Sequence, residues 1–306
     1  MVVKIGTRGS QLALWQAYYV ENLLQKAGLQ TQIVTFETKG DKILEVTLAK
    51  IGSKGVFTEE LETALLNGEI HIAVHSAKDL PSTLPQNLEI IAFTEREKVN
   101  DVLVSYNKNI SLSTENIVVG TSSTRRNAIL HHYYPAVKTV DMRGNLQTRM
   151  RKLQEGACDA ILLAFAGVHR MNLDEYIAEE LSIEQFTPPV GQGSVAIEAS
   201  TNLDEETRNT IKNALNHEET ALALLTERAF LKELEGGCSI PSFAYAKVNG
   251  ENIELNAGLI SLDGQQIIRK SGIRHLAEAT ILGKNIAVEI LENGGKEILE
   301  KIRKGY

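Results

Sequence analysis

The sequence has few of the features that mark secreted or membrane proteins. It contains only 2 cysteines in 306 residues, too few for the disulfide framework of a secreted domain. The longest apolar run, Ala160 to Val168, has nine residues, whereas a membrane-spanning helix needs roughly 20. No charged and then apolar leader precedes the first strand-like segment at Val2 to Ile5. We therefore expect a soluble, cytoplasmic protein with no membrane association.

A surplus of positive charge is also missing. The chain has 32 Lys and Arg against 39 Asp and Glu, a formal net charge of -7. A general nucleic-acid binder needs a broadly basic surface, so this function class is disfavoured. An anionic partner must instead meet a local basic site.

Two parts of the chain follow the same plan of strand, turn and helix. The strand-like Val2–Ile5 is followed by Gly-Thr, by Ser10 and by an amphipathic helix pattern up to Gly28, and NIVVG at 116–120 is followed by TSSTRR and a second helix pattern. A second pair of similar segments is LLNGEIHIAVHS (65–76) and LQEGACDAILLA (153–164), each a helix end, a Gly and an apolar strand. The length and this repetition predict two similar α/β lobes.

The last third of the chain has a different pattern. A helix-like segment at Glu219–Glu235 leads to three strand-like runs, separated by the hairpin signals Asn249-Gly250 and Asp263-Gly264. A closing helix is expected from about Leu276 to Arg303, interrupted near 293–295. These elements predict a small α+β domain. The Pro- and Gly-containing segment 187–200 suits a crossover or hinge.

Basic residues are concentrated in one segment of this acidic chain. Residues 125–152 hold seven Lys or Arg and a single acidic residue, Asp141. Such a run is often only a solvated helix face. However, Arg125 and Arg126 follow Thr121-Ser122-Ser123 at a strand-to-helix junction, where free N–H groups attract anions, and Arg143 follows another strand. With the similar turn GTRGS, which contains Arg8 and Ser10, these residues predict two anion-binding turns that face each other across a cleft.

Three further features have both a structural and a chemical interpretation. Lys78 and Asp79 follow an apolar strand, where they form either a surface ion pair or a catalytic pair. Cys238 follows two glycines, which suits either a small buried side chain or an accessible attachment point. Cys158 is expected in the core. The Gly- and Lys-rich segment 38–58 is either a loop that closes over a site or plain surface.

The chain resembles the porphobilinogen deaminase family, also called hydroxymethylbilane synthases, over essentially its whole length. The strings that carry the resemblance are, in chain order, IGTRGSQLALWQA, TKGD, LAKIGSKGVFTEEL, HIAVHSAKD, VGTSSTRRNA, RGNLQTR, DAILLAFAGVHR, PPVGQGSVAIE, NHEETALALLTER and LEGGCSIP. Two departures, Lys39 in place of a frequent Arg and Gln11 in place of a frequent Pro, touch no chemical role.

The resemblance implies an α/β fold with two lobes like type II periplasmic binding proteins, with mixed sheets and crossing hinge segments. A small α+β domain with a three-stranded antiparallel sheet would follow. The implied domains are 1–94 plus 194–214, 99–188, and 218–306. The chain would be a monomeric transferase of heme and tetrapyrrole biosynthesis that condenses four porphobilinogen molecules, with loss of ammonia, into hydroxymethylbilane. It would carry a covalent dipyrromethane cofactor and no metal, and would pass its product to uroporphyrinogen III synthase.

The resemblance also implies roles for individual residues. Cys238 would hold the dipyrromethane through a thioether, Asp79 would be the catalytic carboxylate, and Lys50 and Lys54 would lie in a candidate lid. The expected ligands of the carboxylates of cofactor and substrate are Arg8, Ser10, Gln16, Ser76, Lys78, Thr121, Ser122, Ser123, Arg125, Arg126, Arg143, Gly144, Arg149, Ala164, Arg170 and Gln192.

One rival function from another class has to be weighed. A two-lobed α/β protein can simply bind a small anion without catalysis, and this would explain the basic segment and the hinge. It would not explain the Gly-Gly-Cys sequence or a separate third domain. Covalent dipyrromethane on the purified protein would exclude it.

Overall fold

The computed structural model describes residues 2–38, 58–235 and 240–304. By its internal contacts the chain divides into two compact units. Unit 1 comprises Met1–Glu97 and Gly193–Leu222, and unit 2 comprises Lys98–Gln192 and Ala223–Tyr306. Each unit is therefore built from two separate stretches of the chain.

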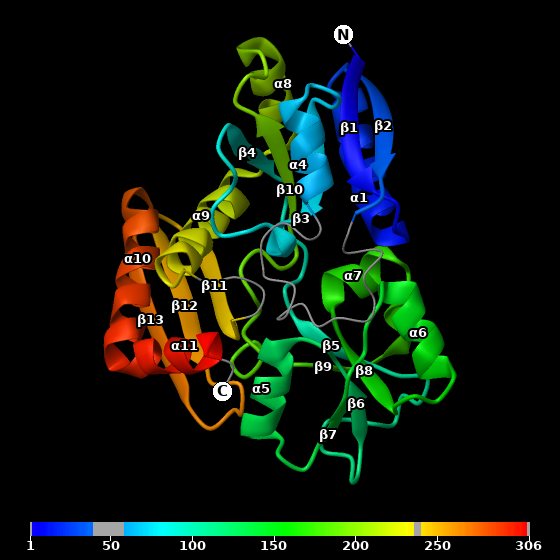
Figure 1. Cartoon of the computed structure of the whole chain (residues 1–306), viewed down its shortest axis with the longest axis vertical. Coiled ribbons are helices and arrows are strands. Elements are labelled where there is room, and N and C mark those ends of the chain that lie inside the picture. Colours follow the sequence, from blue (N-terminus) through cyan, green and yellow to red (C-terminus); the bar gives the residue numbers. More distant parts are fainter. Residues whose placement is uncertain (1, 39–57, 236–239, 305–306) are drawn as a thin grey trace. The chain divides into compact units, whose positions relative to one another are not determined.

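Unit 1 is a mixed five-stranded sheet with the strand order β2-β1-β3-β10-β4 (Figure 1). β1 runs parallel to β2 and β3, whereas β10 runs antiparallel to β3 and β4. The elements are β1 (Val2–Arg8), α1 (Gln11–Lys26), β2 (Gln30–Phe36), α4 (Glu59–Leu66), β3 (Ile72–Ser76), η1 (Ala77–Asp79), β4 (Leu88–Phe93), β10 (Val195–Ser200) and α8 (Glu205–Leu215).

Two apolar clusters hold the unit 1 sheet between helices. Ala17, Val20 and Leu24 of α1 and Ile211 of α8 pack with strand residues in one cluster, and Leu61 of α4 belongs to the other. The α1 side chains recur at intervals of three and four, which places them on one helix face. The predicted amphipathic helix before Gly28 is thus confirmed.

Unit 2 contains a second mixed sheet, ordered β7-β6-β8-β5-β9. β6 runs parallel to β7 and β8, and β5 runs antiparallel to β8 and β9. Its elements are β5 (Asp101–Val104), β6 (Val118–Gly120), α5 (Thr124–Tyr133), β7 (Lys138–Val140), α6 (Leu146–Gln154), β8 (Ala160–Ala164), α7 (Phe165–Arg170), η2 (Asp174–Tyr176) and β9 (Ile177–Glu180).

The two sheets share one topology and one register. Gly6 of β1 pairs with Ala73 of β3, and Gly120 of β6 pairs with Ile161 of β8. In unit 1 the fourth strand, β10, comes from the later stretch of chain, because the chain leaves this unit after β4 and returns to it after β9. In unit 2 the fourth strand is β5, the first strand after the chain enters that unit. The expected pair of similar lobes with mixed sheets and crossing segments is confirmed.

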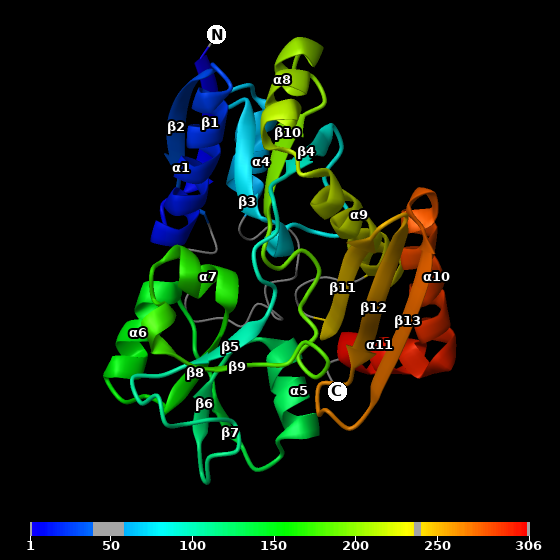
Figure 2. The same cartoon turned by 180° about the vertical axis from the view of Figure 1, so that it is seen from behind.

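The end of the chain forms a three-stranded antiparallel sheet with helices, as expected. Figure 2 shows the strands side by side, in the order β11-β12-β13. Asn249-Gly250 and Asp263-Gly264 lie at the two strand connections, and Gly250 and Gly264 have φ of 60° and 74°. The elements are α9 (Glu218–Glu233), β11 (Ser242–Asn249), β12 (Asn252–Ile260), β13 (Ile267–His275), η3 (Leu276–Glu278), α10 (Ala279–Ile290), η4 (Leu291–Gly295) and α11 (Lys296–Arg303).

This sheet shares a core with the lobe of unit 2. Phe243 and Ile260 belong to the same apolar cluster as Leu103, Ile129 and Phe186. Unit 2 thus contains the second predicted domain and most of the third, and the predicted boundaries between 188 and 218 stay a prediction. Cys158 is buried, as expected, in the cluster on the other side of the unit 2 sheet.

A close contact between α9 and α10 leads to a stability prediction. A Cβ at Gly283 would lie 2.2 Å from the carbonyl oxygen of Thr226, so the helices must separate if a side chain is added. We expect Gly283→Ala to lower the free energy of unfolding by about 1 to 3 kcal/mol or more. Exposed Lys284→Ala is the control and should change it by less than about 0.5 kcal/mol. Equal denaturation midpoints for the two variants would contradict this packing.

Candidate active site

The first group of candidate residues lies where β1 leads into α1. Ser10 caps α1, and its hydroxyl oxygen accepts a hydrogen bond from Ala13 N at 3.4 Å. The hydroxyl of buried Thr7 donates to Ala13 O at 3.1 Å and fastens the turn. Arg8, at the end of β1, is half-buried. The turn thus presents a cation beside a helix N-terminus, an arrangement that favours anions.

The second group lies at the end of β3, the neighbour of β1 in the sheet. The amide of buried Gln16 donates to Ser76 Oγ at 2.8 Å, so α1 and β3 are joined at this point. Lys78 and Asp79 follow in η1 and are half-buried. Because β1 and β3 run parallel, their carboxyl ends bring these candidates to the same edge of the unit 1 sheet as Arg8.

A buried contact between a histidine and a glutamate, which the sequence did not predict, precedes this group. His75 Nε2 lies 3.0 Å from Glu198 Oε2, and both side chains are buried. Glu62 of α4 is a neighbouring carboxylic acid, and its pKa is raised, chiefly by burial, with Glu198 adding to the effect. The strand that ends at Ser76 therefore contacts β10 both by backbone pairing and through the His75 and Glu198 side chains.

The matching turn in unit 2 has three hydroxyl residues with local partners. Ser123 caps α5 by accepting from Arg126 N at 3.4 Å, and Thr121 Oγ1 accepts from Ser123 N at 3.2 Å. Ser122 Oγ accepts from Met142 N at 2.9 Å, which ties the turn to the segment after β7. These bonds hold the N-terminus of α5 at the carboxyl end of β6.

Arg125 and Arg126 bind a carboxylate of the protein itself. Arg125 Nη2 lies 2.5 Å from Asp101 Oδ2, and Arg126 Nη2 lies 2.7 Å from Asp101 Oδ1. The arginines are only 4% and 6% exposed, so for these two the solvated-face interpretation is wrong. Gln192 also reaches Asp101, with Nε2 at 3.0 Å from Oδ1.

The electrostatics of this cluster follow from its burial. Burial alone would raise the pKa of Asp101, but the two guanidinium groups outweigh it and hold that pKa well below its usual range. Burial also lowers the pKa of Arg125, against the attraction of Asp101. Sequence reasoning missed Asp101; the available signal was a single acidic residue at the start of the apolar strand segment DVLV.

A third group of candidates lies between β7 and α6. Arg143 Nε donates to Asp141 Oδ2 at 2.7 Å, and Arg149 Nε donates to Gly144 O at 2.8 Å. Gly144 has φ of 107°, and a Cβ there would lie 2.6 Å from Thr148 Cγ2, so only glycine fits the turn. Burial would raise the pKa of Asp141, but hydrogen bonds, including that from Arg143, lower it overall.

The remaining candidates lie on other parts of the chain. Ala164 ends β8 and precedes α7, and Arg170 is the buried last residue of α7. Cys238, Lys50 and Lys54 lie outside the described residues. No group of three or more His, Cys, Asp or Glu in the described ranges could hold a metal ion, and none of the helices there is long and apolar enough to cross a membrane.

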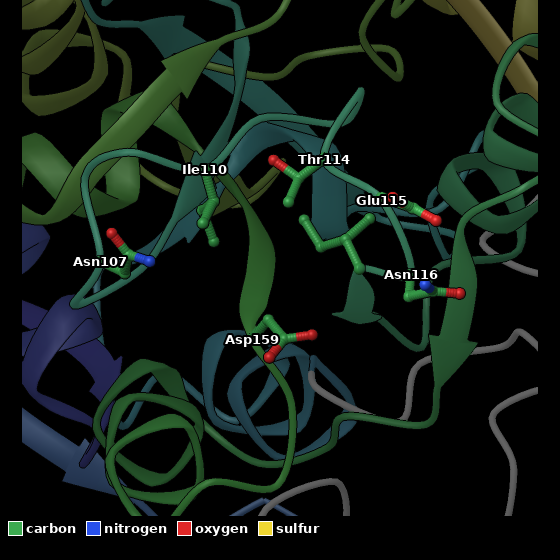
Figure 3. A pocket seen from close by; sticks show the side chains of 7 residues that line it. Asn107, Ile110, Thr114, Glu115, Asn116 and Asp159 are labelled. Carbon is green, nitrogen blue, oxygen red and sulfur yellow. The ribbon is translucent and has the colours of Figure 1, made fainter.

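A surface pocket in unit 2 is separate from these groups. It has a volume of about 350 Å³ and is shown in Figure 3. Its lining includes Asp159 and Ile117, which directly precede β8 and β6. The pocket is therefore at the amino ends of these strands, opposite the edge that carries Ser122 and Ala164, and none of the candidates lines it.

Comparisons with known proteins find relatives over the whole length of the chain. Residues 3–209 match the family model "Porphobilinogen deaminase, dipyromethane cofactor binding domain", and residues 221–292 match "Porphobilinogen deaminase, C-terminal domain". A porphobilinogen deaminase of Desulfosudis oleivorans is 52% identical over 306 residues, covering 99% of both chains. One of Cytophaga hutchinsonii is 54% identical over 304 residues, covering 99% of this chain and 97% of the relative.

The similarities to solved structures are more distant. The VFT2 domain of BvgS from Bordetella pertussis has a TM-score of 0.44 and 17% identity, covering 72% of this chain and 90% of that chain. The periplasmic aliphatic sulphonate binding protein SsuA from Escherichia coli has a TM-score of 0.41 and 14% identity, covering 76% and 69%. The matches to both family models and to these relatives over the whole length show that this chain belongs to the porphobilinogen deaminase family.

Proposed function

We propose that this chain joins porphobilinogen molecules head to tail, with loss of ammonia, and releases hydroxymethylbilane. The observation that carries the proposal is the whole-length match to this family. Basic and hydroxyl side chains at the carboxyl ends of the strands in both sheets, which are suited to binding anions, support it. Transfer of the product to uroporphyrinogen III synthase, a monomeric state and a cytoplasmic location stay predictions.

The donor groups of the candidate site fit a dipyrromethane cofactor. Each pyrrole ring carries two carboxylates, so a two-ring cofactor brings four negative charges. The described candidates supply guanidinium groups, hydroxyls and the N-terminus of α5, and the buried Arg126 Nε has no hydrogen-bond partner among the described residues. When bound, the cofactor would supply the pyrrole carbon from which the chain of rings is extended.

The arginines at the edge of unit 2 would select for carboxylates. Charge-assisted hydrogen bonds contribute about 1.5 to 3 kcal/mol each, against about 0 to 1 kcal/mol for exposed ion pairs. Arg143 is well suited to this role, because its side chain is only 23% exposed and is already oriented by Asp141. A partly sheltered arginine of this kind discriminates between carboxylates better than a basic outer surface would.

Asp79 would act on the substrate. When the aminomethyl group of porphobilinogen loses ammonia, positive charge develops on the ring and its N–H. A half-buried carboxylate at the end of η1 can accept a hydrogen bond from that N–H. It also stabilises the positive charge more in the transition state than in the ground state. Gln16 and Ser76, joined at 2.8 Å, would fix the strand end from which η1 begins.

Substitution of Arg143 tests the carboxylate-binding role. We expect Arg143→Leu to raise the KM for porphobilinogen, or to reduce occupancy by the cofactor, by about 10- to 150-fold, which corresponds to the loss of one charge-assisted hydrogen bond. Arg151→Leu is the matched control, because Arg151 lies in the same basic segment but its side chain is 69% exposed. Steady-state kinetics and intact mass measure both quantities, and equal values for the two variants would refute the role of Arg143.

A further inference from the structure

Asp101 is a buried carboxylate that receives side-chain hydrogen bonds from three residues of unit 2. It opens β5, and its side chain is 0% exposed. The donors are Arg125, Arg126 and Gln192. Each donor side chain also has a backbone acceptor, and these are Thr187 O at 3.0 Å, Leu162 O at 2.8 Å and Val99 O at 2.7 Å. Two attachment points for each donor side chain restrict the orientation of both guanidinium planes.

The charges of this group do not cancel. Arg125 and Arg126 bring two positive charges, and Asp101 brings one negative charge. Its pKa is held low, so the carboxylate remains ionised, and one net positive charge remains in a buried place. An uncompensated buried charge is costly, so a site of this kind favours one anion.

The position of the pair on α5 adds to the attraction for an anion. Arg125 and Arg126 lie in the first turn of this ten-residue helix, directly after the cap at Ser123. The positive end of the helix dipole and the N–H groups of the first turn lie there. In addition, Arg126 Nε is buried without a hydrogen-bond partner in the described part of the chain, although such donors are nearly always satisfied in native proteins.

We propose that Asp101 is a positioning residue for anion recognition, which fixes Arg125 and Arg126 side by side at the N-terminus of α5 so that together they receive one carboxylate. The ligand is a pyrrole carboxylate, from either the cofactor or the substrate. This inference rests on the proposed function, and it assigns a role to a residue that does not itself touch the ligand.

Asp101→Asn separates positioning from simple charge. The substitution keeps the shape but removes the negative charge, so attraction by charge alone predicts tighter binding of carboxylates. A positioning role predicts weaker binding of carboxylates. The side-chain amide nitrogen of Asn donates hydrogen bonds, so it cannot accept one from a guanidinium group. We expect cofactor occupancy below about half, or a KM for porphobilinogen raised about tenfold with a smaller change in kcat. Wild-type occupancy with an unchanged or lower KM would overturn the proposal.

A second pair of variants gives the answer if Asp101→Asn does not fold. When Arg125→Met is combined with Asp101→Asn, Arg126 is the one charged residue left in the group. The net charge of the group in this double variant therefore equals that in the wild type. Compared with Arg125→Met alone, the double variant has one more positive charge but no positioning carboxylate. We expect the double variant to have lower occupancy or a higher KM than the single variant. Equal or tighter binding by the double variant would overturn the proposal.

Two further variants identify the source of any failure. Glu227→Gln is the control for burial: its carboxylate is also 0% exposed, but accepts from the backbone N–H groups of Gly191 and Ala246. It should lower the Tm and leave occupancy and KM within about twofold. Arg126→Leu tests the proposed function itself. If Arg126→Leu binds like wild type, the carboxylate role of the pair fails; if it is impaired while Asp101→Asn is not, only the positioning role fails.

Discussion

Asp79→Asn is expected to retain the fold and the covalent cofactor and to lose turnover by about a hundredfold or more. This is the usual effect of removing one group that stabilises charge in a transition state. The carboxamide has the same shape as the carboxylate, so packing around η1 is preserved. It carries no charge, however, and cannot stabilise the positive charge that develops when ammonia leaves the substrate.

The measurement is the rate of porphobilinogen consumption at saturating substrate. Intact mass should show the cofactor on the variant, and the Tm should stay within a few degrees of the wild type. Asp174→Asn is a suitable control, because Asp174 is a partly exposed aspartate in unit 2 that pairs with His169 and lies outside the candidate site. A wild-type rate for Asp79→Asn would remove Asp79 from the mechanism.

The lobes were predictable because local signals and the tertiary structure agree. Gly6 and Gly120 lie at the same register of their sheets, and each is followed by a serine that caps the next helix. The hairpins at Gly250 and Gly264 follow from residues that accept positive φ. Helix bounds were also close: the segment expected at 219–235 is α9 at Glu218–Glu233.

The sequence alone could not predict which distant charged residues form pairs in the fold. Asp101 and Arg125 are separated by 24 positions, and nothing in the local pattern tells whether an arginine faces solvent, a ligand or a buried carboxylate. The same limit applies to His75 and Glu198, which meet only because β10 inserts between β3 and β4. Burial depends on strand order, and strand order here depends on chain segments that cross between the units.

This pairing also changes the interpretation of the basic segment. The sequence suggested that Arg125, Arg126, Arg143 and Arg149 bind ligand carboxylates, but the first two are already bound to Asp101 of the protein itself. Arg143 is partly exposed and Arg151 largely so. The segment therefore contains buried, partly sheltered and solvated arginines. We expect substitution of the buried arginines to weaken carboxylate binding most and substitution of the solvated ones to weaken it least.

Cys238→Ser should yield a protein without covalent dipyrromethane. A thioether forms from a nucleophilic sulfur, and thiolate is far more accessible near neutral pH than the alkoxide of serine. The only other cysteine is a poor substitute, because Cys158 is buried in the core of unit 2 and burial raises the pKa of its thiol. The residue is only 9% exposed, so it has no room for a two-ring group.

Intact mass spectrometry of wild type, Cys238→Ser and Cys158→Ala decides the attachment. The wild type and Cys158→Ala should show the mass increment of the dipyrromethane, and Cys238→Ser should not. Cys158→Ala should also be destabilised by about 1 kcal/mol through the small cavity it leaves, which distinguishes a structural thiol from a functional one. An increment that persists on Cys238→Ser, or that disappears with Cys158→Ala, would move the attachment away from the Gly-Gly-Cys sequence. Turnover should follow the increment, because without a covalent primer the growing chain of rings has no anchor on the protein.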